Sequence, residues 1–158
     1  RKNQVNHQLV SIKELVNHSL ESLIIPEKIK INITDVTSDP EAMLAPEQMT
    51  QVITNLIKNG IDAIPDGGTI DINLEDTLGD VVITISDTGT GIKEEDRAKI
   101  FEPFFTTKSI GQGTGLGLAT AYGVVKMHKG QITVESNNEP AKGQTGTSFK
   151  IVLPRRKE

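Results

Sequence analysis

Short runs in which apolar and polar residues alternate place the strongest limit on how this chain can fold. Strict alternation is typical of strands that bury one face. One run, residues 29–34, stands alone, and four others form close pairs, residues 69–74 with 81–86 and residues 131–136 with 147–153. A connection that contains Gly separates the members of each pair, so we predict two β-hairpins.

Apolar residues at helical spacing fill the segments between these runs. Pro26 stops the first helical pattern, and Pro46 suits the first turn of the second. Gly130 is of the type that usually stops a helix, so we expect the last helix to end there. The predicted helices cover residues 9–23, 46–61, 93–100 and 116–128.

The order of these elements predicts an α+β fold of two layers, in which helices cover one face of a mixed, mainly antiparallel sheet. With 158 residues the chain fits one domain and is long enough to bury a single core. Only 3% of the residues are aromatic, so that core must consist mainly of Ile, Leu and Val.

Composition also limits the classes of function. Few aromatic residues leave no platform on which single-stranded nucleic acid could stack. A net charge of −4 disfavours a DNA-binding or membrane-binding surface, so we expect no nucleic-acid partner. The absence of Cys excludes disulfides and thiolate metal sites and suits a reducing compartment.

We divide the chain into a short and a long part just before the first predicted strand. It begins with Arg-Lys-Asn, without Met, inside a helical pattern, and we interpret it as a piece of a longer protein. We assign residues 1–25 to the end of a preceding helix or linker plus the first helix of the domain, and residues 26–158 to the domain itself. No apolar run approaches the roughly 20 residues that span a bilayer, although an anchor could lie elsewhere in the parent.

A polar stripe runs along the second predicted helix. Asn55, Asn59 and Asp62 lie at positions i, i+4 and i+7 and therefore share one face. The stripe is either a solvated surface or a metal site, because a neutral carboxamide oxygen is a reasonable ligand for a Mg²⁺ ion that keeps waters and phosphates.

The segment Asp87-Thr-Gly-Thr-Gly-Ile92 follows directly after a β-branched strand. Gly89 and Gly91 allow a sharp turn and the close approach of a ligand. The Asp87 carboxylate, at the end of the strand, can accept a hydrogen bond from an amino group such as adenine N6. A plain Asp-Gly turn is the alternative interpretation.

Residues 104–115 form a long stretch without periodicity, as is usual for a lid or a disordered loop. Three of the four Phe residues lie at its start, within residues 101–105, and can pin the loop, anchor a mobile flap, or both. Its other end, residues 111–118, is rich in Gly and opens a helix, where unpaired N–H groups can bind phosphate. This run follows a loop, unlike a Rossmann fingerprint, and lacks the Gly-Lys-Ser/Thr of a P-loop.

In order and spacing, these four segments resemble the N, G1, F and G2 boxes of histidine kinase catalytic domains. These domains belong to the gyrase, Hsp90, histidine kinase and MutL ATP-binding superfamily. The resemblance covers about residues 28–154, and the segments 101–108 and 115–130 are most similar to nitrogen-regulation-type sensor kinases. It implies a Bergerat-type ATP-binding fold, a lid at about residues 104–115, and ATP and Mg²⁺ as cofactors.

The resemblance also implies roles for individual residues. Asn59 matches the asparagine that binds Mg²⁺, Asp87 the aspartate that recognises adenine, and Thr147 a strand threonine near the base. Lys58 and Lys108 are candidate phosphate contacts or ordinary surface lysines. The implied catalytic residues are Asn59, Asn55 and Lys108, and the implied cofactor-binding residues are Asn59, Asp62, Ala63, Asp87, Gly89, Gly91, Ile92, Thr107, Lys108, Gly113, Thr114, Gly115, Leu116, Gly117, Leu118 and Thr147.

Asn55 departs from the pattern of the ATP hydrolases in this superfamily. Those enzymes carry Glu one helical turn before the Mg²⁺-binding asparagine, where it activates water. Asn55 is neutral and cannot act as a general base. The departure favours transfer of phosphate to a nucleophile brought from elsewhere over hydrolysis.

The acceptor histidine implied by the resemblance is absent from this chain. The family's acceptor is followed by Glu-Leu/Ile and shortly by Asn-Pro, and His7, His18 and His128 lack that context. We expect His7 and His18 on the first helix, which resembles the tail of the dimerisation helix or its linker, and His128 as a C-terminal helix cap.

The resemblance therefore implies a cytoplasmic kinase domain that phosphorylates a histidine on missing dimerisation helices. The phosphate would then pass to the aspartate of a response-regulator receiver domain. We expect the isolated domain to be a monomer and its parent a homodimer. Two alternatives are a non-catalytic nucleotide-sensing interaction module and an Hsp90- or gyrase-type ATPase, against which Asn55 argues.

Overall fold

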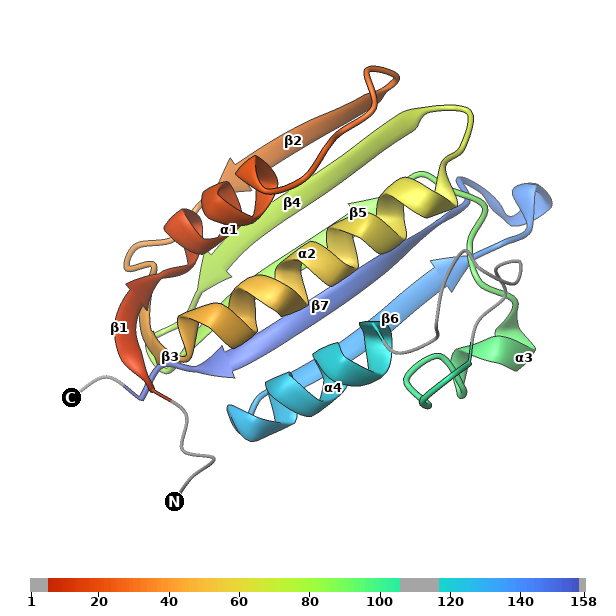
Figure 1. Cartoon of the computed structure of the whole chain (residues 1–158). Coiled ribbons are helices and arrows are strands. Elements are labelled where there is room, and N and C mark those ends of the chain that lie inside the picture. Colours follow the sequence, from red (N-terminus) through yellow and green to blue (C-terminus); the bar gives the residue numbers. More distant parts are fainter. Residues whose placement is uncertain (1–5, 106–116, 157–158) are drawn as a thin grey trace.

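The computed structural model describes residues 6–105 and 117–156, and these form the two layers expected from the sequence (Figure 1). A five-stranded sheet has the order β2-β4-β5-β7-β6, in which β2 is parallel to β4 and every other neighbouring pair is antiparallel. The strands are β2 (Ile29–Asp35), β4 (Gly68–Asp76), β5 (Asp80–Asp87), β6 (Gln131–Asn137) and β7 (Gly146–Pro154). Both predicted hairpins, β4–β5 and β6–β7, are confirmed.

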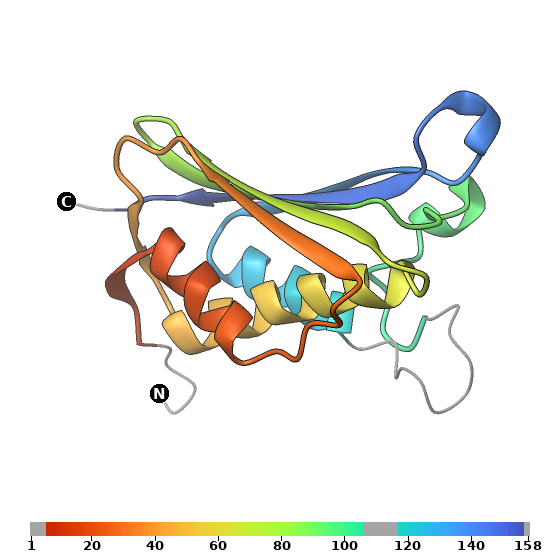
Figure 2. The ribbon, with the colours of Figure 1, turned by 90° about the horizontal axis from the view of Figure 1, so that it is seen from above.

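The helices α1 (Ile12–Glu21), α2 (Pro46–Ala63) and α4 (Gly117–Met127) cover one face of this sheet (Figure 2). The short helix α3 (Glu94–Arg97) and the 3₁₀ turn η1 (Pro140–Lys142) belong to connections at one end of the sheet. Among the residues with described positions, no helix is long and apolar enough to cross a membrane.

The core lies between the sheet and α2. Ile70, Ile72 and Leu74 alternate along β4 and are fully buried against the helices. The buried side of α2 consists of Met49, Val52, Ile53, Leu56 and Ile57, at the helical spacing predicted from the sequence. Residues between the buried ones on the strands, such as Asn73 and Thr84, lie on the face without α1, α2 or α4. The fold thus follows from a period of two in the strands and 3.6 in the helix.

The prediction of where the first helix begins is wrong. Residues Gln8–Ser11 form a strand, β1, that pairs antiparallel with β3 (Glu41–Leu44) in a separate two-stranded sheet. The Ser11 hydroxyl accepts the Glu14 N–H at 3.4 Å and caps α1, so the helix begins one turn later than expected. His7 consequently precedes a strand and does not lie on the helix. A four-residue strand such as β3 is too short to be recognised by alternation.

The end of α4 also differs from the expectation. Lys129 adopts the left-handed conformation, with φ of 61°, and the Gly130 N–H reaches back to the Val125 carbonyl at 2.9 Å. Lys129, and not Gly130, is therefore the residue that ends the helix. Gly130 serves a different purpose, because a Cβ atom there would lie 2.4 Å from the Val152 carbonyl oxygen.

His128 connects the end of α4 to the start of α2. Its Nδ1 atom lies 2.9 Å from the Val124 carbonyl oxygen, and its Nε2 accepts the Ala45 N–H at 3.0 Å. The ring is therefore neutral with the proton on Nδ1, and its other nitrogen accepts the N–H of Ala45, the residue at the N-cap of α2. His128 caps α4 as expected, but it also fastens α4 to α2.

Arg155 follows β7 at the same end of the sheet as His128, and it joins the β2–β3 connection to the β4–β5 turn. Its side chain is 9% exposed, and its guanidinium pairs with the Asp76 carboxylate at 3.0 Å. The same group donates to main-chain carbonyls of the β2–β3 connection and of the β4–β5 turn. These acceptors are the carbonyl oxygens of Asp39, Glu41, Thr77, Leu78 and Asp80.

We expect Arg155→Ala to lower the free energy of unfolding by about 3 kcal/mol, because it leaves several carbonyls and a carboxylate without their charged donor. Urea titration followed by circular dichroism measures the change. Arg156→Ala, at an exposed neighbouring position, is the matched control and should change stability by less than about 0.5 kcal/mol. Equal effects of the two substitutions would contradict a structural role for Arg155.

We expect the stability contributed by His128 to depend on pH. Burial lowers its pKa below the usual 6.5, and the nearby His7 and Arg156 lower it further, although the bond to Val124 opposes them. The contribution is therefore complete above about pH 6.5 and is lost as the pH falls through the lowered pKa. His128→Phe should cost about 2 kcal/mol near pH 8, and the cost should shrink toward pH 5.

Urea unfolding at several pH values measures this difference between wild type and variant. His18→Phe is the matched control, since His18 is exposed on α1. A cost of His128→Phe that stays constant from neutral to acidic pH would show that the ring acts by packing alone.

Candidate nucleotide-binding site

The polar stripe of α2 faces the start of α4. Asn55 and Asn59 are half-buried, and Asn55 Nδ2 donates to the Gly117 carbonyl oxygen at 3.2 Å. Gly117 is the first residue of α4 and follows the segment predicted to be the lid. The carboxamide of Asn55 therefore holds the first turn of α4 against α2, while His128 holds the last.

The loop after β5 packs tightly on the end of α2. Gly60 is buried, and a Cβ atom added to it would lie 3.5 Å from the Asp87 Cβ. At Gly89 a Cβ atom would lie only 2.4 Å from the Ala63 carbonyl oxygen, which also accepts the Thr90 N–H at 3.3 Å. Two glycines, one on each element, thus allow the helix and the loop to meet beside Asp87.

Asp87 ends β5 on the face that carries α2. Its Oδ1 accepts the Gly89 N–H at 2.8 Å. Burial raises the pKa of Asp87 above its usual 3.8, and the N–H groups of Gly89 and Thr147 only partly oppose this. An ionised carboxylate has about four lone-pair positions, so Asp87 keeps the capacity to accept a hydrogen bond from a ligand.

Thr147 lies directly opposite Asp87 in the register of β5 and β7 and is 6% exposed. Its Oγ1 lies 2.9 Å from the Ser136 Oγ on β6, and Ser136 Oγ also accepts the Ile92 N–H at 2.7 Å. At Gly91, where φ is 83°, a Cβ atom would lie 2.1 Å from the Asn137 carbonyl oxygen. The segment after Asp87 is therefore fixed between α2 on one side and the β6–β7 hairpin on the other.

The phenylalanines after α3 have unequal environments. Phe101 lies 6.2 Å from the buried Phe149 and 5.3 Å from Tyr122 of α4, measured between ring centroids. Phe105 is partly buried against the core, whereas Phe104 is 72% exposed. Phe101 and Phe105 thus pin the start of the predicted lid as expected, and Phe104 does not.

The structure brings together most of the predicted site residues that it describes. Ala63, Asp87, Gly89, Gly91, Ile92 and Thr147 surround the ends of β5 and β7, Asn55 and Asn59 occupy the neighbouring face of α2, and Gly117 and Leu118 open α4. Asp62 and Lys58 are exposed near the end of α2. The predicted residues Thr107, Lys108, Gly113, Thr114, Gly115 and Leu116 lie outside the described residues.

Sequence reasoning missed Ser136 and Arg97. Arg97 Nη2 donates to the Ser136 carbonyl oxygen at 2.6 Å and so ties α3 to β6. One signal for Ser136 was available, since it follows Ile132 and Val134 at the inward-facing positions of β6, where an apolar residue is expected. The sequence contains no comparable signal for Arg97.

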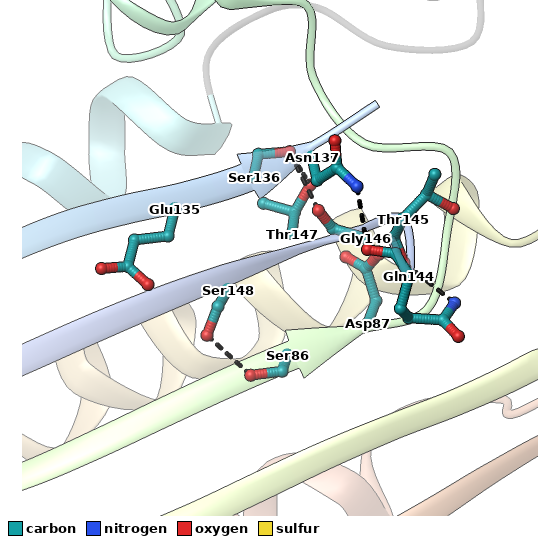
Figure 3. A pocket seen from close by; sticks show the side chains of 10 residues that line it. All are labelled: Ser86, Asp87, Glu135, Ser136, Asn137, Gln144, Thr145, Gly146, Thr147 and Ser148. Carbon is teal, nitrogen blue, oxygen red and sulfur yellow. Dashed lines mark hydrogen bonds between the residues drawn. The ribbon is translucent and has the colours of Figure 1, made fainter. Parts of the chain in front are cut away.

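A separate hollow of about 350 Å³ lies at the same end of the sheet (Figure 3). The Ser86 and Ser148 hydroxyls, 2.7 Å apart, lie in it on the face without α2, because their neighbours Asp87 and Thr147 face the helix. Asp87 and Thr147 border both this hollow and the candidate site on the α2 side, because they stand where β5 ends and β7 begins. The residues around this outer hollow are Ser86, Asp87, Glu135, Ser136, Asn137, Gln144, Thr145, Gly146, Thr147 and Ser148.

Residues 45–157 match the family described as histidine kinase-, DNA gyrase B-, and HSP90-like ATPase. The match includes α2, the loop after Asp87 and the β6–β7 hairpin, which together build the site. The chain therefore belongs to this ATPase family, and membership implies that it binds ATP. The resemblance to histidine kinase catalytic domains that the four sequence segments indicated is confirmed.

Two proteins similar to this chain are a sporulation kinase and a sensor histidine kinase. Sporulation kinase A of Bacillus subtilis (strain 168) is 43% identical over 109 residues, which are 69% of this chain and 17% of the relative. The sensor histidine kinase ZraS of Escherichia coli (strain K12) is 36% identical over 154 residues, covering 96% of this chain and 32% of the relative. The chain thus spans about a third or less of the length of these relatives.

Solved structures give the same result for the fold. The mycobacterial sensor histidine kinase MprB matches with a TM-score of 0.82 and 29% identity, over 96% of this chain and 99% of that one. The catalytic domain of the histidine kinase ThkA, in a nucleotide-free form, matches with a TM-score of 0.80 and 30% identity, over 94% of this chain and 95% of that one. The two-layer fold predicted from the sequence is therefore that of histidine kinase catalytic domains.

We expect Asp87→Asn to stabilise the fold while weakening ATP binding. A raised pKa means that folding disfavours the ionised form, so the neutral variant should unfold at higher urea concentration at neutral pH. This advantage should disappear as the pH falls through the raised pKa of Asp87. Binding should weaken about 10- to 100-fold, which is the usual value of a hydrogen bond to a charged group.

Urea unfolding and calorimetric titration with ATP measure these two effects. Asp66→Asn, in the exposed turn after α2, is the matched control and should change neither. If Asp87→Asn binds ATP as tightly as wild type, Asp87 does not contact the nucleotide.

Proposed function

We propose that this chain is the catalytic domain of a two-component sensor histidine kinase, which transfers the γ-phosphate of ATP to a histidine on a separate dimerisation domain. The observation that carries the proposal is Asp87, a half-buried acceptor with raised pKa held between the end of α2 and the β6–β7 hairpin. A half-buried carboxylate with a perturbed pKa, in a fold of this ATPase family, is typical of a ligand site.

The residues around Asp87 fit a purine. Gly89 and Gly91 bring main chain, without side chains, to the rim of the site. Asp87 and Thr147 lie side by side on the face toward α2 and can accept hydrogen bonds from an exocyclic amino group. We place adenine here, with its amino group toward Asp87.

The polar face of α2 fits the phosphate end of the nucleotide. Asn59 lies one turn beyond Asn55 and directly before Gly60, where an added Cβ atom would lie 3.5 Å from the Asp87 Cβ. Phosphates extending from the base toward α4 would therefore pass Asn59. We assign Asn59 as the ligand of Mg²⁺, which would neutralise phosphate charge and bridge the phosphates to the protein. Lys108 and the glycines at 113 and 115 remain candidates for phosphate contacts.

Asn55 supports transfer over hydrolysis. Its amide group donates to the Gly117 carbonyl and is neutral, so it is not suited to take a proton from water. Phosphoryl transfer requires mainly positioning and charge neutralisation from the protein. A neutral imidazole nitrogen of the acceptor histidine would form the N–P bond as the bond to the β-phosphate oxygen breaks, and ADP would leave.

The partners follow from the proposal. The sensor kinases to which the chain is similar are several times longer, which leaves room for dimerisation helices and a sensor. The phosphohistidine would pass its phosphate to an aspartate on a response-regulator receiver domain in the cytoplasm.

The pairing of β1 with β3 and the packing of α1 on α2 support inclusion of residues 8–21 in the catalytic unit.

We expect a mixture of this chain with the parent kinase's dimerisation helices, Mg²⁺ and γ-labelled ATP to label the helices. Acid-labile, base-stable label on those helices identifies phosphohistidine. Asn59→Ala should reduce the rate of labelling at least about 100-fold, because the metal loses its protein ligand. Asn73→Ala, on the helix-free face of β4, is the matched control and should retain the wild-type rate.

Two other outcomes would contradict the proposal. ATP binding without any labelled histidine would identify a nucleotide-sensing module. Release of inorganic phosphate without labelled protein would identify an ATPase of the gyrase or Hsp90 type.

A further inference from the structure

We propose that Ser136 is the residue that makes this site select a purine with an amino group at position 6 over one with a carbonyl. Ser136 acts through Thr147 by consuming the hydroxyl proton of Thr147, so that only lone pairs face the base. This inference rests on the proposed function, because it needs the base to lie beside Asp87 and Thr147.

The hydrogen bonds around Ser136 define its role. A serine hydroxyl has one proton to donate and two lone pairs that accept. Ser136 Oγ accepts the Ile92 N–H at 2.7 Å and lies 3.0 Å from the Gly146 carbonyl oxygen and 2.9 Å from Thr147 Oγ1. A carbonyl can only accept, so the Ser136 proton is directed to Gly146.

This assignment determines the direction of the remaining bond. With its proton on Gly146, Ser136 can only accept from Thr147, and Thr147 must donate. One arrangement then satisfies all three short contacts of Ser136 at once, with one bond donated and two accepted. The reverse arrangement, in which Ser136 donates to Thr147, leaves the contact with the Gly146 carbonyl without a proton.

The direction of the hydrogen bond between Thr147 and Ser136 determines what Thr147 can offer to the base. Thr147 lies opposite Asp87 on adjacent strands, where directly opposed Cβ atoms are about 5 Å apart. Its hydroxyl proton is already committed to Ser136, so Thr147 presents an acceptor to the site, as does the Asp87 carboxylate. A pair of acceptors favours a 6-amino purine and repels a 6-oxo purine, whose carbonyl would have no donor to meet.

Ser136 also fixes where the base-binding loop lies. The Ile92 N–H that it accepts belongs to the segment after Asp87, and the Ser136 carbonyl accepts Arg97 Nη2 at 2.6 Å. Loss of the hydroxyl would loosen this loop and weaken every nucleotide to a similar extent. The ratio of affinities for two bases therefore separates positioning of Thr147 from general support of the loop.

The test compares ATP with inosine triphosphate, which differs from ATP at the base alone, by calorimetric titration of this chain with Mg²⁺ present. Ser136→Ala frees the Thr147 proton, which can then be donated to the inosine carbonyl. We expect the preference for ATP, the ratio of the two Kd values, to fall about five-fold, which is the usual value of one hydrogen bond. Ser136→Thr keeps the hydroxyl and should restore the wild-type preference to within about two-fold.

Thr147→Val is the second substitution to test in the same titrations. This substitution removes the acceptor itself and should lower the preference for ATP, and Ser136→Ala added to it should change the preference no further. An unchanged preference in Thr147→Val would overturn the proposal even if Ser136→Ala failed to fold. Equal weakening of both nucleotides by Ser136→Ala would also overturn it, since Ser136 would then support the loop alone.

The failure of this inference is distinguishable from failure of the proposed function. If wild type binds ATP and Asp87→Asn binds it more weakly while Ser136→Ala keeps the wild-type preference, only the role of Ser136 is refuted. If wild type binds neither nucleotide, the proposed function falls with it.

Discussion

The contact between the end of α2 and the end of β5 is the constraint on which the candidate site depends. Gly60 on the helix and Gly89 on the loop lack side chains at the point of contact, and the Ala63 carbonyl accepts the Thr90 N–H there. This contact buries Asp87 enough to raise its pKa while leaving acceptor capacity on its carboxylate. A larger residue at Gly89 would separate the helix from the loop and remove both effects.

The helix pair α2 and α4 extends this constraint toward the phosphate end of the site. Asn55 binds the first residue of α4 and His128 fastens the last turn of α4 to Ala45, so a hydrogen bond holds each end of α4 to α2. The helix after the predicted lid therefore has a fixed position relative to Asn59.

Alternation and helical spacing were enough to predict the sheet, its two hairpins and α2, because each of these elements buries one face along its whole length. They failed for residues 8–11 and 41–44, where strands of four residues pair with each other and α1 begins at the Ser11 cap. Asp87 and Gly89 were predicted from a motif and Thr147 from the family resemblance, and the three residues do lie together. Arg97 could not be predicted, because a hydrogen bond between distant segments leaves no period in the sequence. Ser136 was missed although it stands at an inward-facing position of β6, because that position does not reveal which distant groups its hydroxyl binds.

Backbone amide NMR of this chain during titration with a non-hydrolysable ATP analogue and Mg²⁺ tests the location of the site most directly. The account predicts the largest shifts at Asn59, Asp87, Gly89 and Thr147, on the side of the sheet that faces α2. Residues whose side chains lie in the outer hollow, such as Ser86 and Glu135, should shift little. The largest shifts at Ser86, Glu135 and Ser148, with Asn59 and Gly89 unchanged, would contradict the account and place the nucleotide on the other face.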